Sequence, residues 1–376
     1  MKLGISAWRL SGPRFGVARY TDYLVTALSK QLTAQDSIVL FSPTAIDPPI
    51  QSKGNAPVVE RQVRPRLTNA LWENLLLPKA SRDMDIVLGP SYTLPLLGRG
   101  KKVVAIHSVN EAEQGQHSLW YKLTYSLKYR LSAKVADRVI VNSQSTKDRV
   151  VDYYGIAPEK VEVVWLGVDD SFRPYDAEIA ASNNRKTKLH YLGEDCPYVL
   201  FVGTMSARRN VPLLMQAFGA AKKRYNLPHK LFVVGNNIEH IPLDKLAAEF
   251  DITDSFVHFG GSFPHHGDII PIYNGADLFV LPSNTEGFSL TLPEAMACGV
   301  PAITSANSSL GEVANGYAHT LEDINLESLS EAMGQVLCDR ELHEKLKQQG
   351  LERAKDLRWD ECARKTLAIL QQVVSA

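Results

Sequence analysis

One stretch decides the fold: Asp277–Pro301, which reads DLFVLPSNTEGFSLTLPEAMACGVP. Four apolar residues follow Asp277 and predict a buried strand that ends at Leu281, and a loop containing Gly287 follows. A helix is expected to start near Thr291 or Leu292, because Pro293 fits the first helical turn. This strand–loop–helix order builds parallel sheets, and ligands bind such sheets outside the carboxyl ends of the strands.

Short apolar runs that predict strands recur along the whole chain. The first series is Lys2–Ala7, Ile38–Phe41, Val58–Val63, Asp85–Leu88, Lys102–His107, Arg138–Asn142 and Val161–Trp165. The second series is Tyr198–Gly203, Lys230–Gly235, Phe256–Phe259, Asp277–Leu281 and Pro301–Thr304. The stretch between the two series is polar and lacks a hydrophobic pattern. We therefore predict an α/β fold of two Rossmann-like, doubly wound domains, residues 1–170 and 196–357, joined by a linker over residues 171–195.

The composition excludes several classes of protein. The chain has 376 residues, 45% of them hydrophobic and 22% charged, with 41 basic and 41 acidic side chains. A disordered chain is excluded by this balance, and a net charge of zero argues against nucleic acid as a partner. No signal peptide and no run of about 18 apolar residues is visible, and the four cysteines lie far apart, which suits a reducing compartment. We expect a cytoplasmic protein, either soluble or peripheral at the inner face of the cell membrane.

Two carboxylates frame the predicted helix start in the deciding stretch. Glu286 lies in the loop and Glu294 in the first helical turn, with seven residues between them. Free backbone N–H groups around Phe288, Ser289 and Leu290 would face the carboxyl end of the strand, where they could bind an anion or sugar hydroxyls. The alternatives are a solvated loop acid for Glu286 and, for Glu294, a capping box with the threonine three residues before it.

A second pair of candidates follows the predicted strand that ends at Gly203. Thr204 comes next, and Arg208 and Arg209 precede a helix expected to be capped by the asparagine after them. Two guanidiniums at a helix N-terminus could bind a diphosphate through bidentate hydrogen bonds and the helix dipole. The alternative is a solvated arginine pair.

Glu286–Pro301 resembles the signature of the retaining GT-B glycosyltransferases of family four, in which two glutamates are separated by seven residues. The resemblance implies that Glu286 contacts the hydroxyls of the transferred sugar and that Glu294 holds the ribose of the nucleotide. It also implies a GT-B architecture with two domains facing a central cleft and a C-terminal helix, residues 358–376, packed back on the first domain. The donor-binding residues it implies are Gly203, Thr204, Arg208, Arg209, Glu286, Gly287, Phe288, Ser289, Leu290 and Glu294. The sequence departs from the family at Arg209, where lysine is usual, and at Thr204, where several relatives have arginine.

The acceptor side of the resemblance lies in the first half of the chain. The stretch from Trp8 resembles a glycine-rich acceptor loop of the family, which Gly16, Arg19 and Tyr20 match. His107 ends a predicted strand where relatives have a His-Asp pair beside the reacting sugar, although a lone histidine is often only structural. The catalytic residues implied are therefore Glu286, His107 and Arg209.

The activity implied is metal-independent transfer of a sugar, with retention, from a nucleotide diphosphate sugar to a glycan or lipid-linked acceptor. Trp72–Pro78 resembles a segment of mannosyltransferases and favours mannose. No metal or cofactor is expected. The alternatives are an inactive binding or scaffold subunit and another GT-B enzyme, such as a sugar-nucleotide epimerase or a phosphorylase.

Three further patterns carry weaker signals. Asp83-Met84-Asp85 imitates a metal-binding motif but precedes its strand, so we interpret it as surface. His265, His266 and Asp268 lack further ligands at a recognisable spacing for a metal. Residues 117–150 contain seven Lys or Arg and two Asp, a basic segment with aromatic residues that could contact anionic lipid or could be an ordinary solvated helix.

Overall fold

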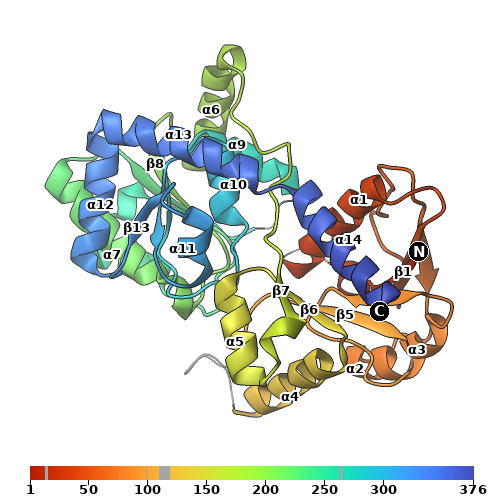
Figure 1. The fold of residues 1–376 in the computed structure, drawn as a ribbon. Helices are drawn as coiled ribbons and strands as arrows, with labels where there is room; N and C mark the ends of the chain where they lie inside the picture. The colour runs from red at the N-terminus through yellow and green to blue at the C-terminus, as the bar shows by residue number, and fades with distance from the viewer. Residues whose placement is uncertain (13–15, 99, 110–118, 262, 264–265) are drawn as a thin grey trace. The chain divides into compact units, whose positions relative to one another are not determined.

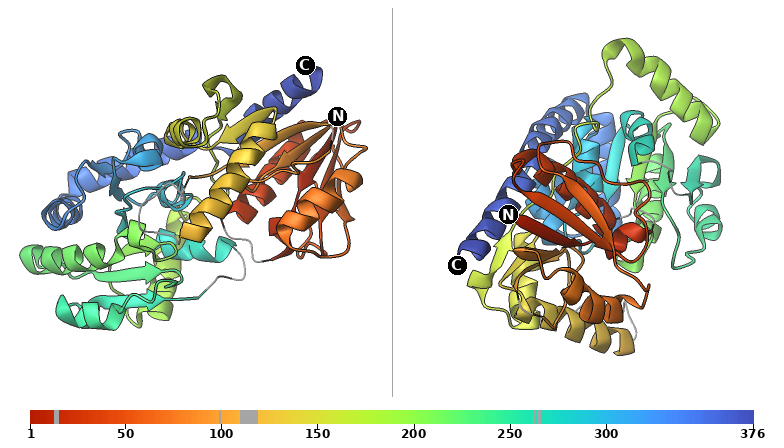
Figure 2. Two further views of the ribbon diagram at one scale, coloured as in Figure 1. Left: turned by 90° about the horizontal axis from the view of Figure 1, so that it is seen from below. Right: turned by 90° about the vertical axis from the view of Figure 1, so that its right-hand side faces the viewer.

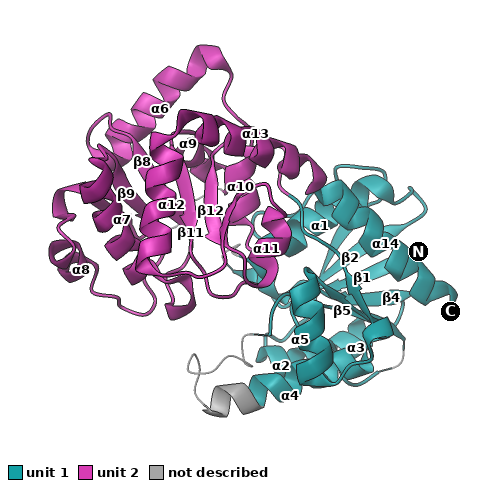
Figure 3. Ribbon diagram, turned by 60° about the vertical axis from the view of Figure 1, so that its left-hand side comes forward, with its two compact units in different colours: residues 1–167, 358–376 teal, residues 168–357 magenta. Residues whose placement is uncertain are grey.

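A computed structural model of the chain describes residues 1–12, 16–98, 100–109, 119–261, 263 and 266–376. The chain divides into two compact units, drawn in different colours in Figure 3. Unit 1 comprises Met1–Gly167 together with Arg358–Ala376, and unit 2 comprises Val168–Leu357. Each unit is built on its own parallel sheet.

The described residues of unit 1 contain a seven-stranded sheet in the order β3-β2-β1-β4-β5-β6-β7. Every pairing in it is parallel. Its strands are β1 Lys2–Ser6, β2 Ser37–Ser42, β3 Val58–Gln62, β4 Ile86–Gly89, β5 Lys101–Ile106, β6 Arg138–Val141 and β7 Val161–Val163. The central strands are almost wholly buried, since helices cover both faces of a parallel sheet and select continuous apolar runs.

The helices of unit 1 include the last helix of the chain, α14, which packs along α1 (Figure 1). The rings of Tyr23 and Trp359 stack there with centroids 5.1 Å apart, and Gln31 Nε2 donates to the carbonyl of Asp360. The helical elements are η1 Trp8–Ser11, α1 Val17–Gln31, α2 Asn69–Leu71, the π-helical turn η2 Trp72–Leu76, α3 Leu77–Ala80, α4 Leu119–Val135, α5 Gln144–Tyr154, η4 Pro158–Lys160 and α14 Trp359–Ser375.

Unit 2 has a parallel sheet of six strands within the described ranges, in the order β10-β9-β8-β11-β12-β13. Its strands are β8 Tyr198–Val202, β9 Lys230–Val234, β10 Phe256–Phe259, β11 Leu278–Leu281, β12 Ala302–Ser305 and β13 His319–Leu321. Its helical elements are α6 Ala177–Leu192, η5 Ala207–Arg209, α7 Val211–Tyr225, α8 Leu243–Glu249, η6 Thr253–Ser255, η7 His266–Ile269, α9 Ile270–Asn274, α10 Thr291–Ala297, α11 Ser308–Ala314, α12 Leu326–Cys338 and α13 Arg340–Asp356.

The segment predicted as a linker, residues 171–195, contains a helix instead. The sixteen-residue helix α6 occupies most of it and projects from the rest of unit 2 (Figure 2). Only Thr187 and Leu192 of this helix are buried. A helix that buries so few residues has no stripe of apolar side chains, and its polar sequence is therefore typical of a loop as well. Strand β13 was not predicted either, because its three residues, which include a histidine, form no recognisable apolar run.

Both sheets reverse their strand order at one point. In unit 1 the reversal lies between β1 and β4, and in unit 2 it lies between β8 and β11. In doubly wound sheets, the segments that follow such neighbouring strands leave in opposite directions, and ligands bind at this point, outside the carboxyl ends of the strands. In unit 2 the two loops that begin there carry Arg208 and Arg209 after β8, and Glu286 after β11.

Candidate functional site: a carboxylate held between two arginines

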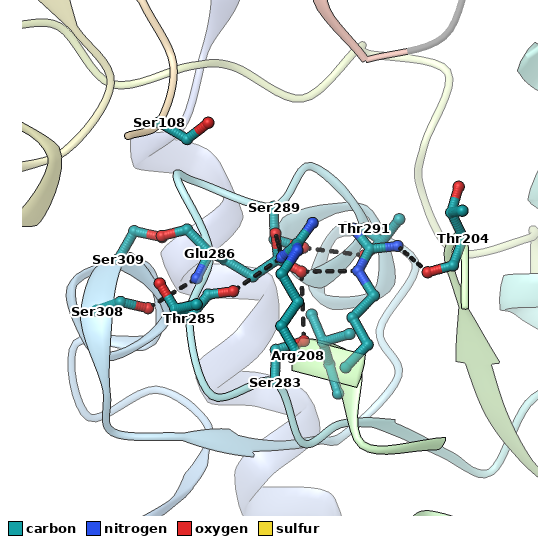
Figure 4. Close-up of polar contacts among 12 residues, drawn as sticks. Ser108, Thr204, Arg208, Ser283, Thr285, Glu286, Ser289, Thr291, Ser308 and Ser309 are labelled. Atoms are coloured by element: carbon teal, nitrogen blue, oxygen red, sulfur yellow. Dashed lines mark hydrogen bonds and ion pairs between the residues drawn. The ribbon is translucent and has the colours of Figure 1, made fainter. Parts of the chain in front are cut away.

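The loop after β11 holds Glu286 in a fixed position. Its backbone N–H donates to Ser308 Oγ at 2.9 Å, and its carbonyl accepts from Ser309 Oγ at 2.8 Å (Figure 4). Both serines belong to the first turn of α11. Ser308 and Ser289 adopt positive φ angles of 55° and 64°, a strained conformation for residues with a side chain that is common at functional sites.

The carboxylate of Glu286 pairs with both arginines predicted for the donor site. Arg208 Nη1 lies 2.6 Å from Oε2, and Arg209 Nε donates to Oε1 at 2.8 Å. Arg208 Nη1 also donates to the carbonyl of Thr285 at 2.8 Å, and Arg209 Nη1 to that of Thr204 at 3.1 Å. Four predicted donor residues are thus brought together. We call Arg208, Arg209 and Glu286 the charge triad.

Electrostatics keep the Glu286 carboxyl ionised. Its side chain is buried, and burial by itself would raise its pKa. The guanidiniums of Arg209 and Arg208 outweigh this effect by charge and hydrogen bonding, and they lower the pKa below the usual value. Since two cations face one anion, the charge triad has a net charge of +1, which suits a further anionic ligand.

Gly203, the first residue after β8, lets Arg209 approach the backbone. A Cβ at Gly203 would lie 2.0 Å from Arg209 Nη1, and the residue has a φ of +152°. A larger residue at this position would displace the guanidinium, and the donor role of Gly203 stays a prediction.

Glu294 lies in α10 and does not act as a helix cap. The backbone N–H of this residue bonds to the carbonyl of Leu290, and no side-chain cap is formed at this helix. Its Oε1 lies 2.9 Å from His266 Nε2, and its Oε2 accepts from Tyr273 Oη at 3.0 Å. The capping-box alternative is wrong, and the side chain belongs to a buried polar cluster.

The remaining donor residues surround Glu286. Phe288 is buried, Ser289 Oγ lies 3.1 Å from Thr291 Oγ1, and Gly287 and Leu290 lie in the same loop. Asn210 is the N-cap residue of α7, as predicted, but its side chain makes no capping hydrogen bond. This residue has a left-handed backbone (φ 51°), and its amide donates instead to Pro282 O and Asn284 Oδ1, which ties the two loops together.

Several residues of the site could not be found from the sequence. Ser283, Ser308 and Ser309 contact Glu286, whereas His266 and Tyr273 contact Glu294. They lie up to 28 residues from their partner, and serine or tyrosine gives no local signal for such contacts. An Asn-Ser-Ser run, which is typical of a helix N-terminus, was the one available sign at Ser308.

His107 follows β5 at the carboxyl edge of the sheet in unit 1. Its side chain is 9% exposed, and its Nε2 lies 2.8 Å from the carbonyl of Pro90. The ring packs edge-on against Tyr20 and Tyr92, with centroids 4.5 and 5.5 Å away. Burial lowers the pKa of this histidine to about 4, although its bond to Pro90 opposes the shift. The imidazole is therefore neutral at pH 7, and its catalytic role stays a prediction.

The predicted acceptor loop is described in part. Gly16 precedes α1 with a φ of +46°, and Arg19 and Tyr20 lie in the first turn of that helix. Tyr20 is 2% exposed, and its hydroxyl has no hydrogen-bond partner among the described residues. Pro13, Arg14 and Phe15, which belong to the same predicted loop, lie outside the described residues.

The two sequence patterns that resemble metal sites, at Asp83–Asp85 and around His266, make other contacts. Asp83 pairs with Arg61 at 2.8 Å, and the carboxylate of Asp85 accepts from the backbone N–H of Lys2. His266 contacts Glu294, whereas His265 lies outside the described residues. Among the residues that the structure describes, no group of three or more His, Cys, Asp or Glu could hold a metal ion.

Both halves of the chain resemble known protein families. Residues 16–172 match the model of Glycosyltransferase Family 4, and residues 184–353 match that of Glycosyl transferases group 1. The O-antigen chain mannosyltransferase B of Escherichia coli is 24% identical and aligns over 98% of both chains.

Solved structures agree in fold. Anabaena HepE in complex with UDP and glucose has a TM-score of 0.77 at 16% identity, covering 99% of this chain and 100% of HepE. Sucrose-phosphate synthase from Thermosynechococcus elongatus has a TM-score of 0.77 at 19% identity, covering 100% and 99% of the two chains. The chain thus consists of a Glycosyltransferase Family 4 domain followed by a Glycosyl transferases group 1 domain, and its two Rossmann-like domains have the GT-B fold.

Proposed function

We propose that the chain is a retaining glycosyltransferase that moves mannose from a nucleotide diphosphate sugar to a hydroxyl of a glycan or lipid-linked acceptor. The charge triad carries this proposal, because it sets two guanidiniums beside a fixed carboxylate where a doubly wound sheet binds its ligand. HepE, solved with UDP-glucose, supports a nucleotide-sugar donor. The mannosyltransferase of Escherichia coli supports mannose.

In the proposed reaction, the bond between the anomeric carbon and the diphosphate oxygen breaks, and its electron pair leaves with the diphosphate. Arg208 and Arg209 would stabilise the charge that develops there. Glu286 would exchange its contacts with the guanidiniums for the sugar hydroxyls, helped by the amides of Phe288, Ser289 and Leu290. Glu294 would bind the ribose hydroxyls through its carboxylate.

The acceptor oxygen then forms its bond to the anomeric carbon on the face that the diphosphate leaves. Its proton passes to the departing phosphate oxygen, so the proposal assigns no general base to the protein and requires no metal. His107 would contribute a hydrogen bond to the reacting sugar rather than a charge. Residues 196–357 would bind the donor, and residues 1–170 with 358–376 would bind the acceptor.

A membrane surface is the proposed setting, at the cytoplasmic face. The described residues contain no helix that is long and apolar enough to span a bilayer. Three apolar residues of helix α4 are exposed at a spacing of four residues, and we call them the α4 surface: Leu127 (58% exposed), Leu131 (36%) and Val135 (40%). Basic Arg130 and Lys134 are exposed on the same helix, and such a combination favours anionic lipid.

The proposed function is tested by a transfer assay with UDP-, GDP- and ADP-sugars, an excess of chelator and a mannose-terminated acceptor. The expected product retains the anomeric configuration of the donor, as measured by the one-bond C1–H1 coupling in its NMR spectrum. A product of inverted configuration, or one formed only when a divalent cation is added, would overturn the proposal.

A further inference from the structure

A cavity of about 460 Å³ lies at the carboxyl edge of the sheet in unit 1. Its walls include η1, which directly follows β1, the first turn of α1 and the segment after β3. The lining residues that matter here are Trp8, Arg9, Ser11, Val17, Ala18 and Arg66. Because β1 borders the point where strand order reverses, this is where unit 1 is expected to take a ligand.

The charges around the cavity have one sign. Arg9 and Arg66 are exposed, and neither has a hydrogen bond or an ion pair to any described residue. The lining as described includes no acidic residue. Two guanidiniums without a carboxylate partner differ from the charge triad of unit 2, in which Glu286 supplies that partner.

A third cation lies close to Arg9. Lys128 of α4 is half-buried, and it has no hydrogen bond to the residues that the structure describes. Burial lowers its pKa, Glu73 opposes the shift, and the charge of Arg9 lowers the pKa further. Arg9 and Lys128 thus repel each other, and an anion bound near both would offset this repulsion.

Neutral donors complete the wall. Ser11 Oγ is buried, and it has no hydrogen-bond partner in the described part of the chain. Helix α1 begins without a side-chain cap and without an acid in its first turn, so the N–H groups of Val17 and Ala18 have no intrahelical acceptor. A hydroxyl, helix amides and guanidiniums together match the several oxygens of a phosphate.

We propose that this cavity binds a phosphate or diphosphate group carried by the acceptor. The assignment rests on the proposed function, since it names the chemical class of the acceptor for that reaction. A neutral sugar would leave the guanidiniums without a counter-charge, whereas a phosphate ester supplies at least one full negative charge and a bidentate partner for each arginine. Phosphate can belong to a phosphorylated or lipid-linked acceptor or to the headgroup of a membrane lipid.

The test is calorimetric titration of the whole protein with inorganic pyrophosphate. The wild type is expected to bind at two sites, one at the charge triad and one at the cavity. Arg9→Gln with Arg66→Gln should remove the cavity site or weaken it at least tenfold, while nucleoside diphosphates bind as before. Arg64→Gln is the matched control, because this arginine is exposed two residues away and contacts Gln62 rather than the cavity.

The other possible results of these titrations decide between the anion site and the proposed function. Unchanged pyrophosphate binding in the double variant overturns the proposal, and so does a parallel loss of nucleotide binding, which would assign these arginines to the donor. If the wild type binds no nucleotide but the double variant still loses a pyrophosphate site, the proposed function fails and the anion site stands.

Vesicles of phosphatidylglycerol separate the two sources of phosphate. If the double variant loses pyrophosphate but binds vesicles like the wild type, the ligand is a group of the acceptor. If it loses both, the phosphate is that of a lipid headgroup. Loss of vesicle binding alone overturns the proposal, since it would reflect surface charge only.

Discussion

Arg209 crosses Gly203 so closely that a Cβ on the glycine would lie 2.0 Å from the arginine Nη1. The same arginine holds Glu286 Oε1 at 2.8 Å. A residue without a side chain therefore determines where one of the two guanidiniums can lie. The position of Arg209 in the charge triad therefore depends on the absence of a side chain at Gly203 as well as on its ion pair with Glu286.

Replacing Gly203 by alanine should displace Arg209 and weaken the binding of nucleoside diphosphates by about 10- to 100-fold, since a charge-assisted hydrogen bond contributes about 1.5–3 kcal/mol. Gly316→Ala is the matched control, because Gly316 also has a positive φ, of +79°, but a Cβ there would meet no atom within 4 Å. Equal nucleotide affinity in the two variants, measured by calorimetry, would show that Arg209 does not contact the donor.

Glu286→Gln should lower the rate of sugar transfer by about 100-fold or more, because the amide cannot balance the guanidiniums or hold the sugar as a carboxylate does. Binding of the nucleoside diphosphate without its sugar should be retained or tightened, since Arg208 and Arg209 lose a competing anion. Glu239→Gln is the control, because this exposed acid accepts from the N–H of Ala207, the residue before Arg208, and does not contact Glu286. Weaker nucleotide binding with an unchanged transfer rate would contradict the assignment.

The same substitution has a signature in stability against pH. Because the folded pKa of Glu286 is lowered, its ionised form stabilises the fold above the unfolded pKa of about 4.3, and this contribution is lost as the pH falls through the folded pKa. The difference in unfolding free energy between wild type and Glu286→Gln should therefore shrink below about pH 4. A difference that stays constant over this range would count against the ion pairs.

The strands were predictable because buried parallel strands are continuous apolar runs, and each of the twelve predicted runs overlaps a strand of the structure. Helix α6 was not predictable, since a helix that buries only Thr187 and Leu192 has no apolar stripe. Glu286, Arg208 and Arg209 were found individually from motifs. Their mutual contact could not be predicted, because the fold brings together residues far apart in the sequence; Arg209 and Glu286 are 77 positions apart.

His107 should make the wild type sensitive to acid between pH 6.5 and 4. Its folded pKa is about 4, below the unfolded value of about 6.5, so the unfolded chain binds a proton that the folded one does not. Stability is complete above the unfolded pKa and falls as the pH drops towards 4, by up to about 3 kcal/mol. His107→Gln should lack this loss in denaturant titrations, whereas the exposed control His190→Gln should keep it. Parallel curves for wild type and His107→Gln would contradict the burial.

The α4 surface should bind anionic vesicles. Leu127→Ser with Leu131→Ser should reduce cosedimentation with phosphatidylglycerol vesicles by about tenfold or more, since each leucine loses on the order of 1 kcal/mol of apolar burial. Leu189→Ser is the control, because this leucine is 47% exposed on α6. A wild type that does not bind these vesicles, or equal losses in the two variants, would contradict the membrane contact.

The central claim is that unit 2 holds a nucleotide diphosphate sugar through the charge triad and Glu294, and thermal unfolding with excess chelator tests it most directly. We will compare UDP, GDP and ADP and their sugars, and the nucleotides of one base should raise the unfolding temperature by several degrees. A ligand at about 100 times its Kd adds about 2.7 kcal/mol to the free energy of unfolding. Glu294→Gln should lose most of this shift but keep that of pyrophosphate. The account is contradicted if no nucleotide shifts the wild type, or if the shift appears only when the chelator is replaced by a divalent cation.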